Sequence, residues 1–392
     1  MREALIVSAV RTPIGNFDGA LKPFTAVQLG TAVIQEALKR ARADAKDVHQ
    51  VIFAMARQAG AGPNPARQMT IKAGLPFEVP AYTINMACAS SLQAVALAAR
   101  AVQAGEADVV VAGGVESMTH VPYLIKRWSM TGKKVGSVQV LDGMHQDGFF
   151  CPLAEQLMGR TAETVAQKYE ILREDQDRLA MESHVKAITA QTTGRFRQEL
   201  MPLSVEDKKG IRIVDQDEHP RSDTSMEKLA KLSPVFLEGG TVTAGNASAM
   251  TDGASAVVIA SREWVKGRAA PLARVEAWVS VGVDPKLMGL GPIPAVKKLH
   301  SVMNRGVDAY DLIEANEAFA AQYLAVESEL KLPRDRTNVN GGAIALGHPI
   351  ACTGARLVTT LVHEMVKRQS RLGLVTLCVS GGLGMALSLT RD

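Results

Sequence analysis

The 392-residue chain has little of what marks several classes of protein. It contains only 3 Trp, 5 Tyr and 9 Phe, which is few for the aromatic stacking platforms of single-strand nucleic-acid binders. Its 44 basic and 40 acidic residues form no block of like charge. The net charge of +4 therefore does not suggest a nucleic-acid partner, although it would not repel an anionic cofactor. No apolar run approaches the roughly 20 residues of a membrane-spanning helix, so no integral membrane protein is expected.

Cysteine is also scarce, and its spacing excludes two common uses. The chain has four cysteines, widely separated and without a C-x-x-C pair: Cys88, Cys151, Cys352 and Cys378. This pattern predicts neither a disulfide framework nor a zinc site, and no other metal site is expected. An apolar run begins almost directly after Met1, with no basic leader before it. We therefore expect a protein of the reducing cytoplasm.

What the sequence does contain is a sizeable apolar core. The composition is 47% hydrophobic and 21% charged, and the length corresponds to two or three domains at ~150 residues each. Short β-branched runs alternate with Ala-rich helical stretches, as in the predicted strand 4–10 and the predicted helix 25–42. This alternation predicts an α/β fold with buried, largely parallel strands.

One arrangement of predicted elements occurs twice. A long helix at 90–103 leads to a strand at 108–112 and then to Gly113-Gly114. A second helix at 354–367 leads to a strand at 373–379 and then to Gly381-Gly382. The pattern suggests an internal duplication, although helix, strand and glycine often follow one another in α/β proteins.

The middle of the chain lacks this alternation. Residues 120–248 are rich in charge and Met and include irregular stretches such as 204–219. We interpret them as an insertion between two sheet-bearing halves. The predicted halves comprise residues 1–119 with 249–270, and residues 271–392.

Cys88 is the first candidate for chemistry. It lies at the start of the predicted helix 90–103, where unpaired N–H groups and the helix dipole favour a thiolate. A thiolate is the nucleophile that acyl transfer needs. The alternative is a small buried apolar residue, which most free cysteines are.

Three more polar side chains occupy candidate loops. His348 follows Gly341, Gly342 and Gly347, in a loop that would fix one imidazole. Cys378 ends a predicted buried strand just before a glycine-rich turn. Asn316 precedes an apparent helix start, where ordinary helix capping is the alternative to a role in chemistry.

Two cysteines and one histidine on separate glycine-bracketed loops fit one reaction scheme. One cysteine would attack a thioester carbonyl, the histidine would keep it ionised, and the second cysteine would move protons. Backbone N–H groups would hold the developing oxyanion.

These segments, in this order and spacing, resemble the thiolase family of CoA-dependent acyltransferases. The likeness runs along essentially the whole chain and includes further segments at residues 10–15, 85–92, 113–118, 241–248, 291–294, 314–320, 341–349 and 377–384. It implies a duplicated five-layered α-β-α-β-α fold with an inserted loop domain at 120–248. It also implies a ping-pong reaction that condenses two acetyl-CoA to acetoacetyl-CoA or cleaves a 3-ketoacyl-CoA. CoA would be substrate and product, with no permanently bound cofactor.

The resemblance also implies a role for each site residue. Cys88 would be acylated, His348 would activate it, and Cys378 would act as acid and base at the α-carbon. Asn316 would hold a water that, with His348, stabilises the enolate oxygen. The backbone N–H groups of Cys88 and Ser380 would form the oxyanion hole. CoA and its acyl group would contact residues of the loop domain and tunnel: Arg221, Ser248, Leu157, Met158, Met288, Ala318 and Phe319.

A few positions depart from the common family pattern. Ser380 stands where glycine is usual, and a serine at positive φ would be strained. Ala351 and Cys352 replace a Gly-Ala or Gly-Cys pair, and Ser91 replaces a frequent glycine. Leu157 stands where acetoacetyl-specific members often have histidine, which keeps a broad 3-ketoacyl-CoA thiolase open as an alternative.

The resemblance also bears on assembly, and several alternative hypotheses stay open. The family implies homodimers that often pair into tetramers, and residues 121–144, with Trp128, Met130 and a turn at 131–134, occupy the tetramerisation loop. The alternative for these residues is an ordinary surface hairpin.

Competing functions are a decarboxylating ketoacyl synthase, an inactive thiolase-like protein that binds acyl-CoA or lipid, and a redox thiol protein. Cys352 either touches the site or is a small buried residue beside a helix start.

Overall fold

Ten of the described strands form one mixed sheet in which the strand order repeats itself. The computed structural model describes residues 2–127, 137–207 and 210–391. The strand order is β14-β15-β16-β13-β1-β12-β5-β3-β4, with β2 paired to β12. The bounds of these strands are β1 (Ala4–Arg11), β2 (Gly15–Asn16), β3 (Gln50–Ala54), β4 (Ala81–Ile84), β5 (Val109–Ser117), β12 (Thr251–Ser261), β13 (Ala273–Gly282), β14 (Leu312–Ala315), β15 (Leu372–Val379) and β16 (Leu383–Thr390).

The two ends of this sheet have the same topology. In one half β1 pairs antiparallel with β12, β12 antiparallel with β5, and β5 parallel with β3. In the other half β13, β16, β15 and β14 follow the same order with the same directions. The halves meet where β1 pairs with β13. The internal duplication inferred from the repeated helix and strand is therefore confirmed.

Two details of the predicted strands are wrong. The strands are not largely parallel, because the parallel pairs are confined to β3–β4, β3–β5 and β14–β15. The short turn that joins β15 to β16 can connect only antiparallel neighbours. The predicted strand 108–112 also does not end at Gly113-Gly114, since β5 continues through both glycines to Ser117.

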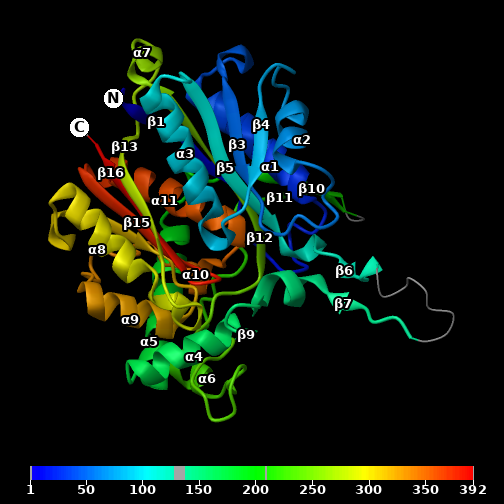
Figure 1. Ribbon diagram of the computed structural model, residues 1–392, viewed down its shortest axis with the longest axis vertical. Coiled ribbons are helices and arrows are strands. Elements are labelled where there is room, and N and C mark those ends of the chain that lie inside the picture. The colour runs from blue at the N-terminus through cyan, green and yellow to red at the C-terminus, as the bar shows by residue number, and fades with distance from the viewer. Residues whose placement is uncertain (1, 128–136, 208–209, 392) are drawn as a thin grey trace.

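The helices pack in three layers around the sheet (Figure 1). Helices α3 and α11 lie side by side in a central apolar core that both halves share. Helices α1 and α2 cover the outer face of the first half, and α8 and α9 cover that of the second. With the two halves of the sheet lying between these helix layers, this is the expected five-layered arrangement. The bounds are α1 (Ala26–Ala41), α2 (Pro65–Lys72), α3 (Ser90–Ala104), α8 (Pro292–Met303), α9 (Ala320–Leu330) and α11 (Thr353–Arg368).

Helix α1 shows why the ends of some helices can be predicted from the sequence. Thr25 and Gln28 form a reciprocal capping box at its start, which satisfies two otherwise unpaired N–H groups. Arg42 ends the helix in a left-handed conformation at φ 52°. The predicted range 25–42 therefore includes both caps of the observed helix.

The chain between the halves forms helices and short hairpins. The helices are α4 (Met158–Lys168), α5 (Arg173–Thr192) and α6 (Met226–Ala230), and α7 (Arg262–Val265) and α10 (Ala343–Leu346) occur later. Strands β8 (Phe150–Cys151) and β9 (Gln156–Leu157) pair with each other. The stretch 204–219, expected to be irregular, largely belongs to the hairpin of β10 (Leu203–Asp207) and β11 (Gly210–Val214).

A third strand pair projects from the body of the molecule. Strands β6 (Tyr123–Leu124) and β7 (Leu141–Asp142) pair antiparallel, and Figure 1 shows them extending away from the sheet. Trp128, Met130 and the turn 131–134 of the predicted tetramerisation loop lie outside the described residues. None of the helices in the described ranges has both the length and the apolar character needed to cross a membrane.

Candidate active site

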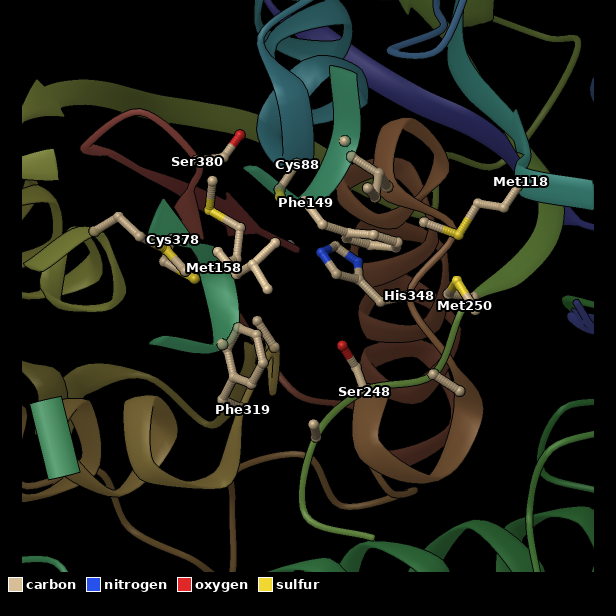
Figure 2. A pocket seen from close by; sticks show the side chains of 18 of the residues that line it. Cys88, Met118, Phe149, Met158, Ser248, Met250, Phe319, His348, Cys378 and Ser380 are labelled. Atoms are coloured by element: carbon tan, nitrogen blue, oxygen red, sulfur yellow. The ribbon is translucent and has the colours of Figure 1, made fainter. Parts of the chain in front are cut away.

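Ten of the predicted site residues line one cavity of about 340 Å³. They come from both halves of the sheet and from the chain between them, and Figure 2 shows several of them around a common space. These residues are Cys88, Leu157, Met158, Ser248, Met288, Ala318, Phe319, His348, Cys378 and Ser380. The fold thus brings together two thiols and one imidazole that lie up to 290 residues apart in the chain.

Cys88 lies in a tight turn between a strand and a central helix. The turn is η2 (Ala87–Ala89), and it leads directly into α3. Ala87 has φ 45°, a left-handed conformation that is uncommon for a residue with a side chain. Burial raises the pKa of the Cys88 thiol, although the Ser380 N–H, the charge of Arg57 and the N–H of Cys88 itself oppose that rise. The expectation of a resting thiolate is therefore wrong, because burial outweighs the helix terminus.

The two amides predicted for the oxyanion hole act on the Cys88 thiol. The backbone N–H groups of Ser380 and Cys88 favour its ionised form, so both are candidates to hold the oxygen of an acyl group bound to this sulfur. Ser380 is not among the residues with positive φ, whereas Gly381 and Gly382 have φ 85° and 86°. The expected strain at Ser380 is absent because these two glycines form the turn after β15.

His348 points one nitrogen at a hydroxyl and the other at the cavity. Its Nδ1 lies 2.6 Å from the Thr353 hydroxyl oxygen, and that hydroxyl donates its single proton to the Pro349 carbonyl at 3.2 Å. We assign the tautomer in which Nδ1 donates to Thr353 and Nε2 keeps a lone pair. Nε2 is buried and has no hydrogen-bond partner among the described residues.

The electrostatic surroundings keep this imidazole neutral. Burial lowers the pKa of His348 to about 3, and the positive charges of Arg356 and Arg57 act in the same direction. A neutral imidazole with a free Nε2 can accept a proton from a thiol. Sequence reasoning missed Thr353, although a hydroxyl five residues after the histidine at the start of a helix was a usable signal.

Cys378 is the second thiol in the cavity. It lies near the end of β15 opposite Gly384 and is 1% exposed. Burial raises its pKa well above the ordinary value, and the neighbouring Cys88 adds to the rise. Cys378 is therefore a protonated thiol at neutral pH, ready to donate a proton.

Asn316 is buried, does not line the cavity and is not a helix cap. Helix α9 begins at Ala320 with Phe319 at its N-cap, so the capping alternative is wrong. Asn316 is 2% exposed, and neither polar atom of its amide has a partner within the described part of the chain. An unpaired buried amide is costly, which marks this side chain as available to a water or a ligand.

Arg221 lies in a second, smaller pocket. This pocket has a volume of about 150 Å³ and is lined by His184, His219, Arg221, Asp223, Thr224, Lys228, Leu229, Leu232, Ala244, Gly245 and Ile344. One loop connects the two pockets, since Ala244 and Gly245 line this one while Ala247 and Ser248 line the main cavity.

The positions that depart from the family pattern have structural partners. Cys352 is 1% exposed and does not line the cavity, and burial raises its pKa to about 12. It is a small buried residue beside a helix start. The Ser91 hydroxyl accepts the Ala355 N–H at 2.8 Å and so links α3 to α11, while Ala351 donates its N–H to Glu116 at 3.1 Å.

The cavity also includes residues that sequence reasoning did not single out: Arg57, Met118, His145, Gly148, Phe149, Gly159, Phe236, Ala247, Ala249, Met250 and Ile350. Most are apolar and carry no signal that distinguishes them from core residues. Arg57 and His145 are the exceptions, because both carry N–H donors.

Comparison with known proteins connects this arrangement to one family. Residues 4–263 match the family model described as the thiolase N-terminal domain, and residues 269–391 match the thiolase C-terminal domain. The chain is 48% identical over 394 residues to an acetyl-CoA acetyltransferase of Pseudomonas aeruginosa, with all of both chains covered. It is 47% identical over 392 residues to an acetyl-CoA acetyltransferase of Escherichia coli, again with full coverage.

Solved structures agree with these sequence matches. The crystal structure of a Bacillus anthracis acetyl-CoA acetyltransferase is 43% identical and has a TM-score of 0.96, covering 100% of this chain and 99% of that one. The human mitochondrial 3-ketoacyl-CoA thiolase is 38% identical, also with a TM-score of 0.96 and the same coverage.

Proposed function

The chain belongs to the thiolase family and is a CoA-dependent acyltransferase, and from this premise we propose how its cavity makes and breaks a carbon–carbon bond. Cys88 is the nucleophile, His348 its base, and Cys378 the acid and base at the α-carbon. The observation that carries the proposal is the convergence of these three side chains on one buried cavity. Both thiols are held protonated and the imidazole neutral.

Cleavage begins as the Cys88 sulfur attacks the 3-keto carbon of a 3-ketoacyl-CoA. The thiol proton moves to His348 Nε2, and the N–H groups of Cys88 and Ser380 hold the oxyanion. When the carbon–carbon bond breaks, the electron pair passes to the α-carbon of the departing acetyl-CoA. Cys378 donates a proton to that carbon.

The second half-reaction releases the acyl group. The sulfur of a free CoA attacks the thioester on Cys88 and gives up its proton to the Cys378 thiolate left by the first half-reaction. The Cys88 sulfur departs and takes back its proton from His348, so the products are a shortened acyl-CoA and the free enzyme, and the two substrates react in separate steps. In the opposite direction the same groups join two acetyl-CoA into acetoacetyl-CoA.

Asn316 supports the enolate in this scheme. Its unpaired amide would hold a water that, together with His348, stabilises the enolate oxygen of acetyl-CoA. The burial of the amide and its lack of protein partners support this role.

CoA would extend from the main cavity toward the second pocket, along residues 120–248. The pantetheine arm would pass Ser248 and Phe319, while Leu157, Met158, Met288 and Ala318 would line the path of the reacting groups. The phosphorylated adenosine end would lie near Arg221, whose pocket also contains Lys228. The shared loop 244–249 supports this route.

The test is CoA-dependent loss of acetoacetyl-CoA absorbance, measured for the wild type and for Cys88→Ala. Turnover should disappear in Cys88→Ala. Cys352→Ala is the matched control and should keep at least half of the activity, because that thiol lies outside the cavity. Binding of CoA without any turnover by the wild type would contradict the mechanism and favour an inactive acyl-CoA-binding protein.

A broad-chain 3-ketoacyl-CoA thiolase is the second candidate. It is favoured by Leu157, an apolar residue that lines the cavity beside Met158. Pockets discriminate each methylene by only about 1–3 kcal/mol. A higher kcat/KM for 3-ketohexanoyl-CoA than for acetoacetyl-CoA, reduced by Leu157→His, would select this candidate.

We also propose a homotetramer built from two dimers, located in the reducing cytoplasm that suits four free thiols. Strand β4 ends the sheet, and the nearby Phe77 is 77% exposed. The projecting β6–β7 hairpin supports a further contact between dimers. Light scattering should give about four times the chain mass of 41.8 kDa, and a mass of one chain would contradict the assembly.

A further inference from the structure

Arg57 places a buried cation in the wall of the main cavity. The side chain follows β3 and is 7% exposed. Its Nη2 donates to the Gly148 carbonyl at 3.0 Å, while its Nε is buried and has no partner among the described residues. The guanidinium packs directly against Gly148, where a Cβ would lie 3.0 Å from Nε and 3.3 Å from Nη2.

Glu116 balances the charge of Arg57, but its carboxylate accepts no hydrogen bond from the Arg57 guanidinium in the described structure. The carboxylate accepts the backbone N–H groups of Ala56 at 3.3 Å, Arg57 at 3.0 Å and Ala351 at 3.1 Å. No side-chain hydrogen bond from Arg57 to this carboxylate occurs in the described structure. A guanidinium has five N–H donors, so most of those on Arg57 remain without a protein acceptor.

Through Gly148 these donors lie next to Phe149, on the side of the cavity that Met118 and Ile350 also form. Met118 and Ile350, which line the cavity with Arg57, belong to the apolar cluster that packs against Cys88 and Phe149. Ala318 and Phe319 belong to a different cluster around Cys378. Figure 2 shows Met118 and Phe319 on opposite sides of His348. An acyl group on Cys88 that extends past Phe149 would therefore approach Arg57.

His145 adds a second polar group to this wall. It begins the π-helical turn η5 (His145–Phe149), which contains Gly148. Its exposed ring lines the cavity and stacks on Phe150 at 6.0 Å between ring centroids. The hydrogen bond from Arg57 to the Gly148 carbonyl ties this turn to the cation.

We propose that Arg57, assisted by His145, binds a carboxylate at the far end of the acyl chain, so that the enzyme prefers 3-oxoacyl-CoA substrates with a carboxylate terminus. Burying a guanidinium with unused donors is unfavourable, and a carboxylate supplies the acceptors in the planar geometry that arginine favours. This specificity rests on the proposed function and identifies its substrate class.

The experiment compares two substrates of equal carbon number. The CoA thioesters of 3-oxohexanedioic acid and 3-oxohexanoic acid differ only in a terminal carboxylate or methyl group. The wild type should show at least a tenfold higher kcat/KM for the carboxylate substrate. Arg57→Met should lower that value by about tenfold to a hundredfold, the range of a charge-assisted hydrogen bond, and Arg57→Lys should retain part of it.

Met250→Leu is the matched control, because Met250 also lines the cavity and this exchange conserves volume and charge. It should leave the ratio of the two kcat/KM values unchanged. Inhibition of the wild type gives an answer that needs no variant. With acetoacetyl-CoA as substrate, glutaryl-CoA should inhibit at least tenfold more strongly than pentanoyl-CoA, which has the same number of acyl carbons.

Two results would overturn the inference while leaving the thiolase mechanism intact. One is preference for the methyl-ended substrate with normal acetoacetyl-CoA turnover, and the other is equal inhibition by the two acyl-CoA probes. Either would make Arg57 a structural counter-ion of Glu116. Loss of acetoacetyl-CoA turnover in the wild type would instead refute the proposed function itself.

Discussion

At the scale of single residues, the Thr353 hydroxyl decides which nitrogen of His348 carries the proton. In the assigned tautomer the hydroxyl donates to Pro349 and accepts from Nδ1–H, which leaves Nε2 free for its proposed role as the base. Thr353→Val keeps the shape and removes this acceptor. We expect kcat for acetoacetyl-CoA thiolysis to fall by about tenfold to a hundredfold, corresponding to the loss of a hydrogen bond of about 1–3 kcal/mol.

Thr353→Ser separates positioning from packing in that experiment. Serine restores the hydroxyl without the methyl group, so it should recover most of kcat. Normal kcat in the valine variant with reduced kcat in the serine variant, and unchanged Tm for both, would show that the methyl contact and not the hydrogen bond matters.

The low pKa of His348 predicts an unusual pH profile. An imidazole with the ordinary pKa of 6.5 would become protonated below that pH and lose its function as a base. With its pKa lowered to about 3, His348 stays neutral throughout the range from pH 5 to 8. The rate of Cys88 acylation by acetyl-CoA, followed by mass spectrometry in single turnover, should change less than twofold between pH 7.5 and 5.5. A roughly tenfold fall per pH unit below 6.5 would disagree, provided circular dichroism shows an intact fold.

Local sequence predicted the reacting groups better than their surroundings. Cys88 and His348 could be identified as candidates because each lies in a turn or loop bracketed by small residues or glycines, and Cys378 because its strand leads directly into such a turn. Thr353 gave a local signal that was not used, whereas Arg57 could not be identified, since its role depends on contacts that the chain makes only after folding. The thiolate expected at Cys88 failed for the same reason, because burial is a property of the assembled cavity and not of the helix terminus.

At the scale of elements, the sequence predicted where helices begin and end but not whether neighbouring strands are parallel or antiparallel. Capping residues such as Thr25 act on their own helix, so a short window contains the information. The direction of β12 depends on its two partners β1 and β5, which lie far away in sequence. Several glycines that follow the predicted strands allow close approach of two backbones, as at Gly113, Gly114 and Gly382.

Gly384 tests this packing role. A Cβ on Gly384 would lie 2.0 Å from the Gly291 carbonyl oxygen, and Gly384 is also the strand partner of Cys378. Gly384→Ala must therefore push β16 away from the start of α8. We expect a loss of about 1–3 kcal/mol in unfolding free energy or more, measured by urea denaturation, together with reduced kcat.

Gly282→Ala is the matched control in the neighbouring strand. Its nearest neighbour to an added Cβ is the Gly382 carbonyl oxygen at 4.0 Å, which is ordinary contact distance. This variant should change the unfolding free energy by less than about 0.5 kcal/mol. Similar losses in both variants would mean that the backbone contact at Gly291 has no special effect.

At the scale of the whole molecule, the active site depends on how the two halves and the chain between them are held together. Cys88 belongs to the first half, whereas His348, Cys378 and Ser380 belong to the second. Arg11, on β1, provides one of the strongest links to the intervening segment. It contacts Glu199 at 2.6 Å and Asp217 at 2.6 Å and 2.9 Å, and all three side chains are at most 2% exposed.

Arg11→Met should reveal the strength of this link. Burial alone would lower the pKa of Arg11, but Asp217 and Glu199 raise it above the ordinary value, so the guanidinium is fully charged. Its removal leaves two buried carboxylates without their cation, which typically costs about 3–5 kcal/mol. Urea denaturation should show this loss as a lower midpoint.

Arg2→Met is the comparison that makes the result specific to burial. Arg2 pairs with Asp108 at 3.1 Å, but the two side chains are 44% and 43% exposed, and water weakens such pairs to less than about 1 kcal/mol. The midpoint should therefore shift little in this variant. If Arg11→Met also lost less than about 1 kcal/mol, the buried carboxylates would have to be neutralised by protons or other donors. The link between β1 and the segment around 199–217 would then rest on packing, such as the contact of Arg11 with the Phe196 ring at 4.9 Å, and not on charge.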